Sequence, residues 1–88
     1  MFTGIIETLG TITSIEEEGD NVHFTLNSNF TNELQIDQSV AHNGVCLTVI
    51  AIEGNTYTVT AIKQTMRITS LKHWSVGDKI NLERCMQM

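Results

Sequence analysis

The segment from Ser39 to Thr48 constrains the fold most, because an Asn-Gly pair lies at its centre between two short runs of strand-forming residues. Asn43 and Gly44 both tolerate the positive φ angles of a type I′ turn, so the segment predicts a tight β-hairpin. Side chains alternate between the faces of a sheet, which places Ser39, Cys46 and Thr48 together on one face. This small polar patch is the candidate ligand site. Counting outward from the turn predicts the cross-strand pairs His42–Val45, Ala41–Cys46, Val40–Leu47 and Ser39–Thr48.

A second turn follows shortly after this hairpin. The sequence from Glu53 to Thr56 places Gly54 at the first turn position, as a type II′ turn prefers. The run over residues 60–65 therefore comes alongside the polar patch, and its last backbone groups are expected to lose their ladder partners and become available to a ligand. Counting outward predicts the pairs Ile52–Tyr57, Ile50–Val59 and Thr48–Ala61, and continued pairing would set Cys46 opposite Lys63.

The other segments also predict short strands joined by turns. Within the opening segment 1–15 we expect a β-rich run over residues 9–15 with a bulge or bend at Gly10, then a charged turn over 16–21 and a half-buried strand over 22–27. One helical turn is expected over 31–34, with Leu34 and Ile36 inward. Further along, we expect a turn or short helix over 63–67, a turn at 77–78 and a strand over 79–85. A chain of 88 residues suffices for one hydrophobic core, which predicts a single domain. About six strands at this spacing predict an all-β fold, a small closed antiparallel barrel.

Composition excludes several classes of partner. Ten acidic against five basic residues give a formal net charge of −5, which argues against nucleic acid, whose phosphates require clustered Lys and Arg. No apolar run is long enough to cross a bilayer, and the N-terminal residues lack the pattern of a secretion signal. The sequence therefore predicts a cytoplasmic protein with no membrane partner.

Cysteine and histidine spacing predicts no metal site. Cys46 and Cys85 lie in different predicted strands, and the three histidines are scattered along the chain. We expect both thiols to be free, as in a reducing compartment.

The sequence resembles a known family along nearly its whole length. The opening Met1–Glu7 and the segment Ser39–Val49 together are highly specific, and further matching positions are Lys63, Thr65, Thr69, Val76–Asp78 and Asn81–Arg84. On these residues the chain is similar to riboflavin synthases of the alpha type, specifically to their N-terminal lumazine-binding barrel. The resemblance implies a six-stranded antiparallel Greek-key barrel with one or two short helical turns. It also implies that residues 1–88 are the first of two tandem barrels.

The family's activity is then what this resemblance implies for the parent enzyme. Two molecules of 6,7-dimethyl-8-ribityllumazine are converted into riboflavin and 5-amino-6-ribitylaminouracil by transfer of a four-carbon unit, without metal or organic cofactor. The two substrates meet between the N-barrel of one subunit and the C-barrel of its neighbour in a homotrimer, and an isolated barrel is expected to dimerise. Because the lumazine ring acidifies its own methyl group, the protein's main contribution is the relative orientation of two flat rings. Such alignment can lower a barrier by roughly 7–11 kcal/mol.

The resemblance also assigns site residues. Ser39 and Cys46 lie nearest the methyl chemistry, and with Thr48 they are the candidate catalytic residues. Phe2 is expected to act as an aromatic lid, and Gly4, Ile5 and Ile6 to line the neighbouring half of the site. Cys46, Leu47 and Thr48 are expected to contact the ring. Along the pyrimidine edge, substrate contacts are expected from the backbone of Thr60, Ala61, Ile62, Lys63, Gln64 and Thr65. Gln64 departs from the family, which mostly has glutamate there, so this chain lacks the negative charge at that position.

Two alternative functions stay open beside the synthase domain. A stand-alone, non-catalytic flavin or lumazine carrier would share the fold, although such carriers lose the residues equivalent to Ser39 and Cys46. A small β-barrel adaptor of the oligonucleotide-binding type is disfavoured by the acidic charge and the few aromatic residues. Two residues receive structural interpretations: we expect His42 to be exposed beside the turn, and Trp74 to plug one end of the barrel.

Overall fold

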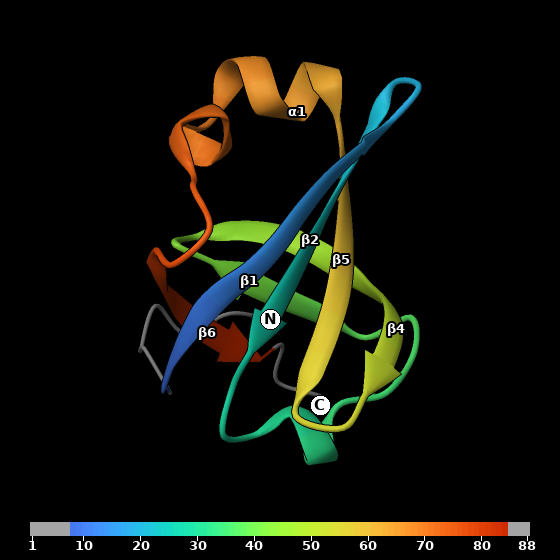
Figure 1. Cartoon of the computed structure of the whole chain (residues 1–88), viewed down its shortest axis with the longest axis vertical. Coiled ribbons are helices and arrows are strands. Elements are labelled where there is room, and N and C mark those ends of the chain that lie inside the picture. Colours follow the sequence, from blue (N-terminus) through green and yellow to red (C-terminus); the bar gives the residue numbers. More distant parts are fainter. Residues whose placement is uncertain (1–7, 85–88) are drawn as a thin grey trace.

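The fold is a closed six-stranded antiparallel barrel, seen in a computed structural model that describes residues 8–84. Neighbouring strands follow the order β1-β2-β5-β4-β3-β6, and β6 closes the ring onto β1 (Figure 1). The predicted all-β barrel is thus confirmed. The elements are β1 (Thr8–Glu18), β2 (Asn21–Asn27), the 3₁₀ turn η1 (Thr31–Glu33), β3 (Ser39–His42), β4 (Val45–Glu53), β5 (Thr56–Ile62), the short helix α1 (Lys63–Ile68), the 3₁₀ turn η2 (Ser70–His73) and β6 (Lys79–Arg84).

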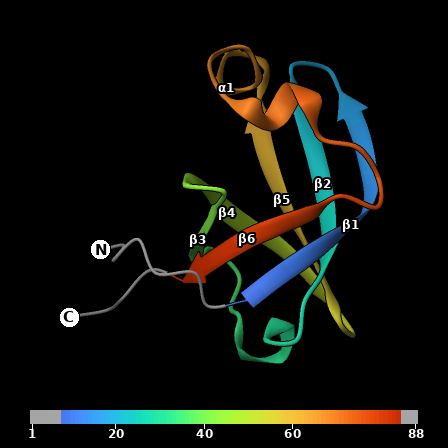
Figure 2. The ribbon, with the colours of Figure 1, turned by 90° about the vertical axis from the view of Figure 1, so that its left-hand side faces the viewer.

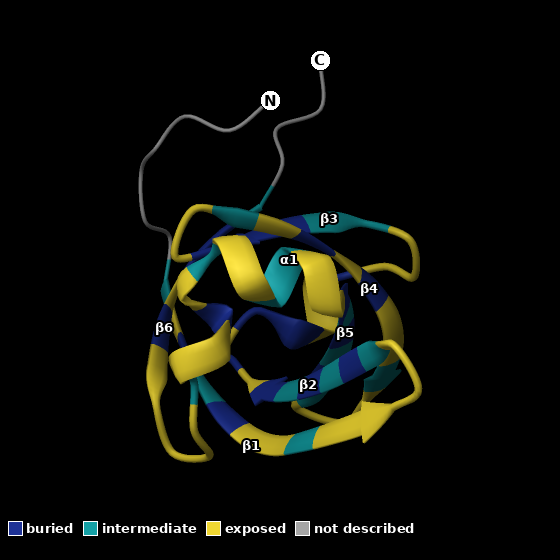
Figure 3. Ribbon diagram, turned by 90° about the horizontal axis from the view of Figure 1, so that it is seen from above, coloured by how far each residue is buried: buried dark blue, intermediate teal, exposed yellow. Residues whose placement is uncertain are grey.

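Alternating burial along the strands builds the core. In β2 and β5 every second residue is buried, including Phe24, Leu26, Tyr57 and Val59, and the residues between them line the outer surface. This period of two is the pattern expected of strands with one face on a packed interior. At one end of the barrel α1 and η2 lie across the opening, with their exposed faces outward (Figures 1, 2 and 3).

β1 differs from its predicted form. It continues through the glutamates to Glu18, so that only residues 19 and 20 form the turn to β2. The irregularity in its pairing lies between Ile12 and Ser14, and the predicted bulge at Gly10 is wrong. Gly10 instead allows close packing, because a Cβ atom there would lie 2.8 Å from Cδ1 of Leu82.

Several short connections agree with prediction, whereas η2 at Ser70–His73 was not predicted. η1 and α1 form where helical turns were expected, and Gly77 has a positive φ of 97° in the last turn. Leu34 is buried as expected, but Ile36 is exposed. Its exposure follows from the loop: Asp37 adopts a positive φ of 72° and donates its amide to the Val49 carbonyl, so the chain turns at the rim of the barrel and leaves Ile36 outside.

Candidate functional site

The first hairpin has the predicted register. Asn43 and Gly44 have φ angles of 51° and 86°, as a type I′ turn requires. Ser39 pairs with Thr48 and Ala41 with Cys46, while Val40 and Leu47 point into the core. Cys46 and Thr48 are exposed, Ser39 is half-buried, and the three side chains therefore share the outer face of the barrel.

The second hairpin departs from prediction after its first pairs. Ile52 pairs with Tyr57 as expected, but a bulge between Val49 and Ala51 shifts the register by one residue. The predicted pairs Ile50–Val59 and Thr48–Ala61 are consequently wrong, and the structure has Val49 opposite Val59 and Thr48 opposite Thr60. A bulge puts two residues of one strand opposite one residue of the other, and counting outward from a turn does not reveal such an extra residue.

β4 and β5 separate beyond the Thr48–Thr60 pair, where β5 continues into α1 (Figure 1). In the shifted register Cys46 would face Ile62 rather than Lys63, yet no pairing of these residues is formed. We call this place, bounded by Cys46, Thr48, Thr60 and Ile62, the β4–β5 gap.

Backbone polar groups from both strands point into the β4–β5 gap. The Lys63 amide donates to the Asp20 carbonyl at 2.9 Å, so alternation turns the N–H of Ile62, the last residue of β5, away from β2 and toward β4. The Ile62 carbonyl belongs to the N-cap of α1 and accepts the first hydrogen bond of that helix. The residues flanking the two-residue Asn-Gly turn bond to each other across the hairpin, so alternation turns the N–H and C=O of Cys46 away from β3, toward β5. Donors and acceptors without strand partners at such a place can bind the edge of a planar heterocycle.

The structure places the other predicted contact residues in three settings. Leu47 and Ala61 are buried toward the core, so only their backbone could meet a ligand. The side chains of Thr60, Ile62, Lys63 and Gln64 lie on the outside, and half-buried Thr65 accepts a bond from the Thr69 hydroxyl at its carbonyl oxygen. Phe2, Gly4, Ile5 and Ile6 lie outside the described residues, as does Cys85.

His42 is buried, and the prediction that it is exposed is wrong. Because a carbonyl only accepts, Nδ1 of His42 donates to the Val40 carbonyl at 2.9 Å, and Nε2 then accepts the Tyr57 hydroxyl at 2.8 Å. Burial lowers the pKa of His42 to about 4, although the bond to Val40 opposes that shift, and burial raises the pKa of Tyr57. The neutral pair fixes β3 to β5 across the interior. The His42 side chain points inward, although it lies next to the turn, because it alternates with Ala41 and Asn43. This alternation could have been read from the sequence.

Trp74 packs at the end of the barrel that α1 covers, in agreement with the predicted plug. Its ring meets Phe24 edge to face at a centroid distance of 5.1 Å and lies 6.3 Å from the His42 ring. The indole therefore reports on the interior rather than on the ligand site.

A further polar cluster beside the gap was not predicted from the sequence. His23 on β2 contacts Thr60 on β5 and Glu18 on β1. The alternation of His23 with the buried Val22 and Phe24 was the available signal, since it places the imidazole on the outer face.

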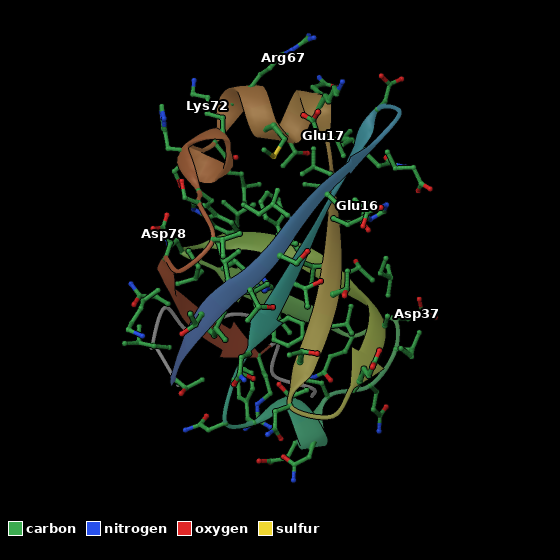
Figure 4. The ribbon with its side chains drawn as sticks, viewed as in Figure 1. Glu16, Glu17, Asp37, Arg67, Lys72 and Asp78 are labelled. Carbon is green, nitrogen blue, oxygen red and sulfur yellow. The ribbon has the colours of Figure 1, made fainter. Side chains whose placement is uncertain are left out.

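Charged side chains project outward around the barrel instead of converging on one face (Figure 4). Arg67 and Lys72 extend from the helical cap, whereas Asp78 and Asp37 lie on opposite sides of the barrel in this view (Figure 4). A depression of about 340 Å³ is lined by Glu33, Gln35, Ile36, Asp37 and Gln38, in and after η1. Within residues 8–84 no three or more His, Cys, Asp or Glu side chains gather closely enough to hold a metal ion, and no helix there has the length and apolar character to cross a bilayer.

Comparison with known proteins decides the family. The Lumazine binding domain family matches residues 3–85. The chain belongs to this family. It is also 42% identical over 87 residues to the riboflavin synthase of Bacillus amyloliquefaciens and 42% identical over 86 residues to that of Escherichia coli (strain K12).

These alignments cover 98% and 96% of this chain but only 40% of each riboflavin synthase. Among solved structures, LumP complexed with 6,7-dimethyl-8-(1′-D-ribityl) lumazine superimposes with a TM-score of 0.89 at 26% identity, covering 97% of this chain and 49% of LumP. LumP complexed with riboflavin superimposes with a TM-score of 0.87 at 27% identity, covering 96% of this chain and 46% of LumP. The lumazine-binding domain described here is thus homologous to riboflavin synthase and corresponds to about two-fifths of those enzymes.

Proposed function

We propose that this lumazine-binding domain binds 6,7-dimethyl-8-ribityllumazine and riboflavin at the β4–β5 gap. The observation that carries the proposal is the backbone of Cys46 and the amide of Ile62, which point into the gap between the hydroxyl-bearing residues Thr48 and Thr60. A pyrimidine ring edge carries alternating carbonyl and N–H groups, and backbone amides and carbonyls are complementary to that pattern. The LumP structures with these two ligands, on the same fold, support the choice of ligand.

We further propose that the domain is the N-terminal of two tandem barrels in a riboflavin synthase. In that enzyme Ser39, Cys46 and Thr48 would act at the reacting methyl group, and the segment 60–65 would hold the pyrimidine edge. The second lumazine would come from a C-terminal barrel of a neighbouring subunit in a trimer, and residues 2–6 would line that half of the site. The protein then orients two rings, and the small hydroxyl and thiol groups position a proton or a water.

The exposed free thiol of Cys46 fits a reducing compartment, which supports a cytoplasmic location. The alternative is a non-catalytic carrier with the same ligand site. The retained Ser39 and Cys46 favour the synthase, and turnover by the complete two-barrel protein distinguishes the two functions.

Binding is tested by titrating riboflavin with the 88-residue chain and following flavin fluorescence. We expect quenching with a Kd of about 1 μM or lower, which corresponds to roughly 8 kcal/mol of binding free energy. Thr48→Arg should abolish quenching because it fills the mouth of the gap. Thr58→Arg is the matched control on the same outer face, next to Ala51 and away from the gap, and should bind as the parent does. Absence of quenching by the parent chain at high protein concentration would reject both flavin functions.

Turnover by the isolated barrel is expected to be very low. Each active site in the proposed enzyme needs a second barrel to present the other lumazine, and without that partner the two rings are not held together. The measurement is riboflavin formation from the lumazine, followed by fluorescence, with a two-barrel riboflavin synthase as positive control. Rapid riboflavin production by the purified 88-residue chain would contradict the division of the site between barrels.

A further inference from the structure

Three polar side chains form a continuous hydrogen-bonded chain across three neighbouring strands, β1, β2 and β5, which lie side by side in Figure 1. Nδ1 of His23 is 2.7 Å from Oγ1 of Thr60, and Nε2 of His23 is 3.0 Å from Oε1 of Glu18. The His23 side chain is only 21% exposed, whereas Glu18 is 75% exposed. The imidazole is therefore held between its two partners, with the carboxylate on the solvent side.

The chemistry of the partners fixes the direction of these bonds. An ionised carboxylate only accepts hydrogen bonds, so Nε2 of His23 carries a hydrogen and donates it to Glu18. In the neutral ring Nδ1 is then the acceptor, and the Thr60 hydroxyl donates its single hydrogen to it. The Thr60 oxygen is left with lone pairs only, and it can accept a hydrogen bond but has no hydrogen to donate.

The surrounding side chains favour this arrangement. On β1, Glu16 is paired directly with His23 and Glu18 makes the contact, so carboxylates lie on the β1 side of the ring. On β5, the outward residues near His23 are Thr58, Thr60 and Ile62, which carry no charge. The ring hydrogen is thus directed toward β1 and the ring lone pair toward β5.

Thr60 is also the residue that closes the β4–β5 gap, because its pair with Thr48 is the last one formed between the two strands. We propose that His23, held by Glu18, is a positioning residue that presents the Thr60 hydroxyl oxygen to the gap as a fixed hydrogen-bond acceptor. The gap would therefore select a ligand that offers an O–H or N–H donor at this point. This inference rests on the proposed binding of riboflavin at the gap.

A double-mutant cycle on riboflavin affinity tests the proposal. His23→Leu removes the acceptor of the Thr60 hydrogen, so the hydroxyl can rotate and we expect the Kd to rise by roughly threefold to tenfold, the range of one net hydrogen bond. Thr60→Val removes the oxygen and should raise the Kd by a similar factor. In the Thr60→Val background, His23→Leu should change the Kd by less than about twofold, because the residue through which it acts is gone.

Two controls separate positioning from a structural effect. His23→Asn keeps an acceptor close to the position of Nδ1 and should restore most of the affinity that His23→Leu loses. Thr58→Val removes a hydroxyl bonded to Thr25 at 3.0 Å on the same face, one outward position away from the gap, and should leave the Kd unchanged. Far-ultraviolet circular dichroism and urea unfolding of each variant confirm that the folded protein is being titrated.

The outcomes distinguish the inference from the proposed function. Parent-like affinity in His23→Leu, or an equal loss in the parent and Thr60→Val backgrounds, overturns the positioning role while binding at the gap stands. Failure of the parent chain to bind riboflavin overturns the proposed function, and the inference with it.

Discussion

Lowering the pH from 7 to 4 is expected to destabilise the barrel by about 3 kcal/mol through His42 alone. Its pKa is about 4 in the folded protein and 6.5 in its ordinary state, so the unfolded chain binds a proton that the folded protein does not. The contribution of neutral His42 to the free energy of unfolding is therefore fully present above pH 6.5 and is lost as the pH falls toward 4. Each unit of pKa difference corresponds to about 1.4 kcal/mol. The physical cause is burial of an imidazole whose Nε2 already accepts the Tyr57 hydroxyl.

The measurement is urea unfolding at several pH values, followed by fluorescence of the single tryptophan, Trp74. Carboxylates also titrate in this range, so the decisive comparison is with His42→Gln, whose amide does not titrate. This variant should be less stable than the parent at pH 7, but its free energy of unfolding should change less between pH 6.5 and 4. His73→Gln makes the same change at an exposed histidine and should keep the parent slope. Equal slopes in the parent and in His42→Gln would show that His42 is not the responsible group.

Replacing Ile62 by proline is expected to weaken riboflavin binding by between about fivefold and a hundredfold with little loss of stability. The Ile62 amide points into the β4–β5 gap and has no strand partner there, so its removal breaks no bond between strands. The φ angle of Ile62 is −81°, near the value that proline fixes, and Ala61 before it is extended as a residue preceding proline should be. A ligand acceptor that loses this donor stays desolvated without a partner, which costs about 1–3 kcal/mol.

Ile62→Ala is the matched control for this experiment. It removes the exposed aliphatic side chain but keeps the amide, and it should bind riboflavin with close to the parent Kd. Tight binding by Ile62→Pro, with a fold intact by circular dichroism, would mean that the ligand is not held by this amide. The result would leave the family assignment intact and relocate the ligand on the barrel.

The candidate site joins a rigid hairpin to the end of another strand. The β3–β4 hairpin is fixed by its type I′ turn, and the separation from β5 follows from the start of α1 at Lys63. Ser39, Cys46 and Thr48 are therefore held on a regular sheet, while the backbone beside them is free of strand partners. The proposed binding of a flat ring benefits from both features, because orientation requires rigidity and recognition requires unpaired polar groups.

The sequence by itself determined the all-β fold, the first hairpin and the shared face of Ser39, Cys46 and Thr48. These features follow from local rules, because only certain residues tolerate positive φ and side chains alternate with a period of two. The same rules failed where closure of the barrel intervened. The bulge after Val49 moved Thr60, instead of Ala61, opposite Thr48.

Only the tertiary structure decided which polar groups meet. His42 is hydrogen-bonded to Tyr57 across the core. His23 on β2 is hydrogen-bonded to Thr60 on β5 and to Glu18 on β1, the strands on its two sides. These contacts join residues that are distant in the chain, and their geometry depends on strand order and register around a closed ring. Local propensity carries no information about that order, which is set by how all six strands bury one common core.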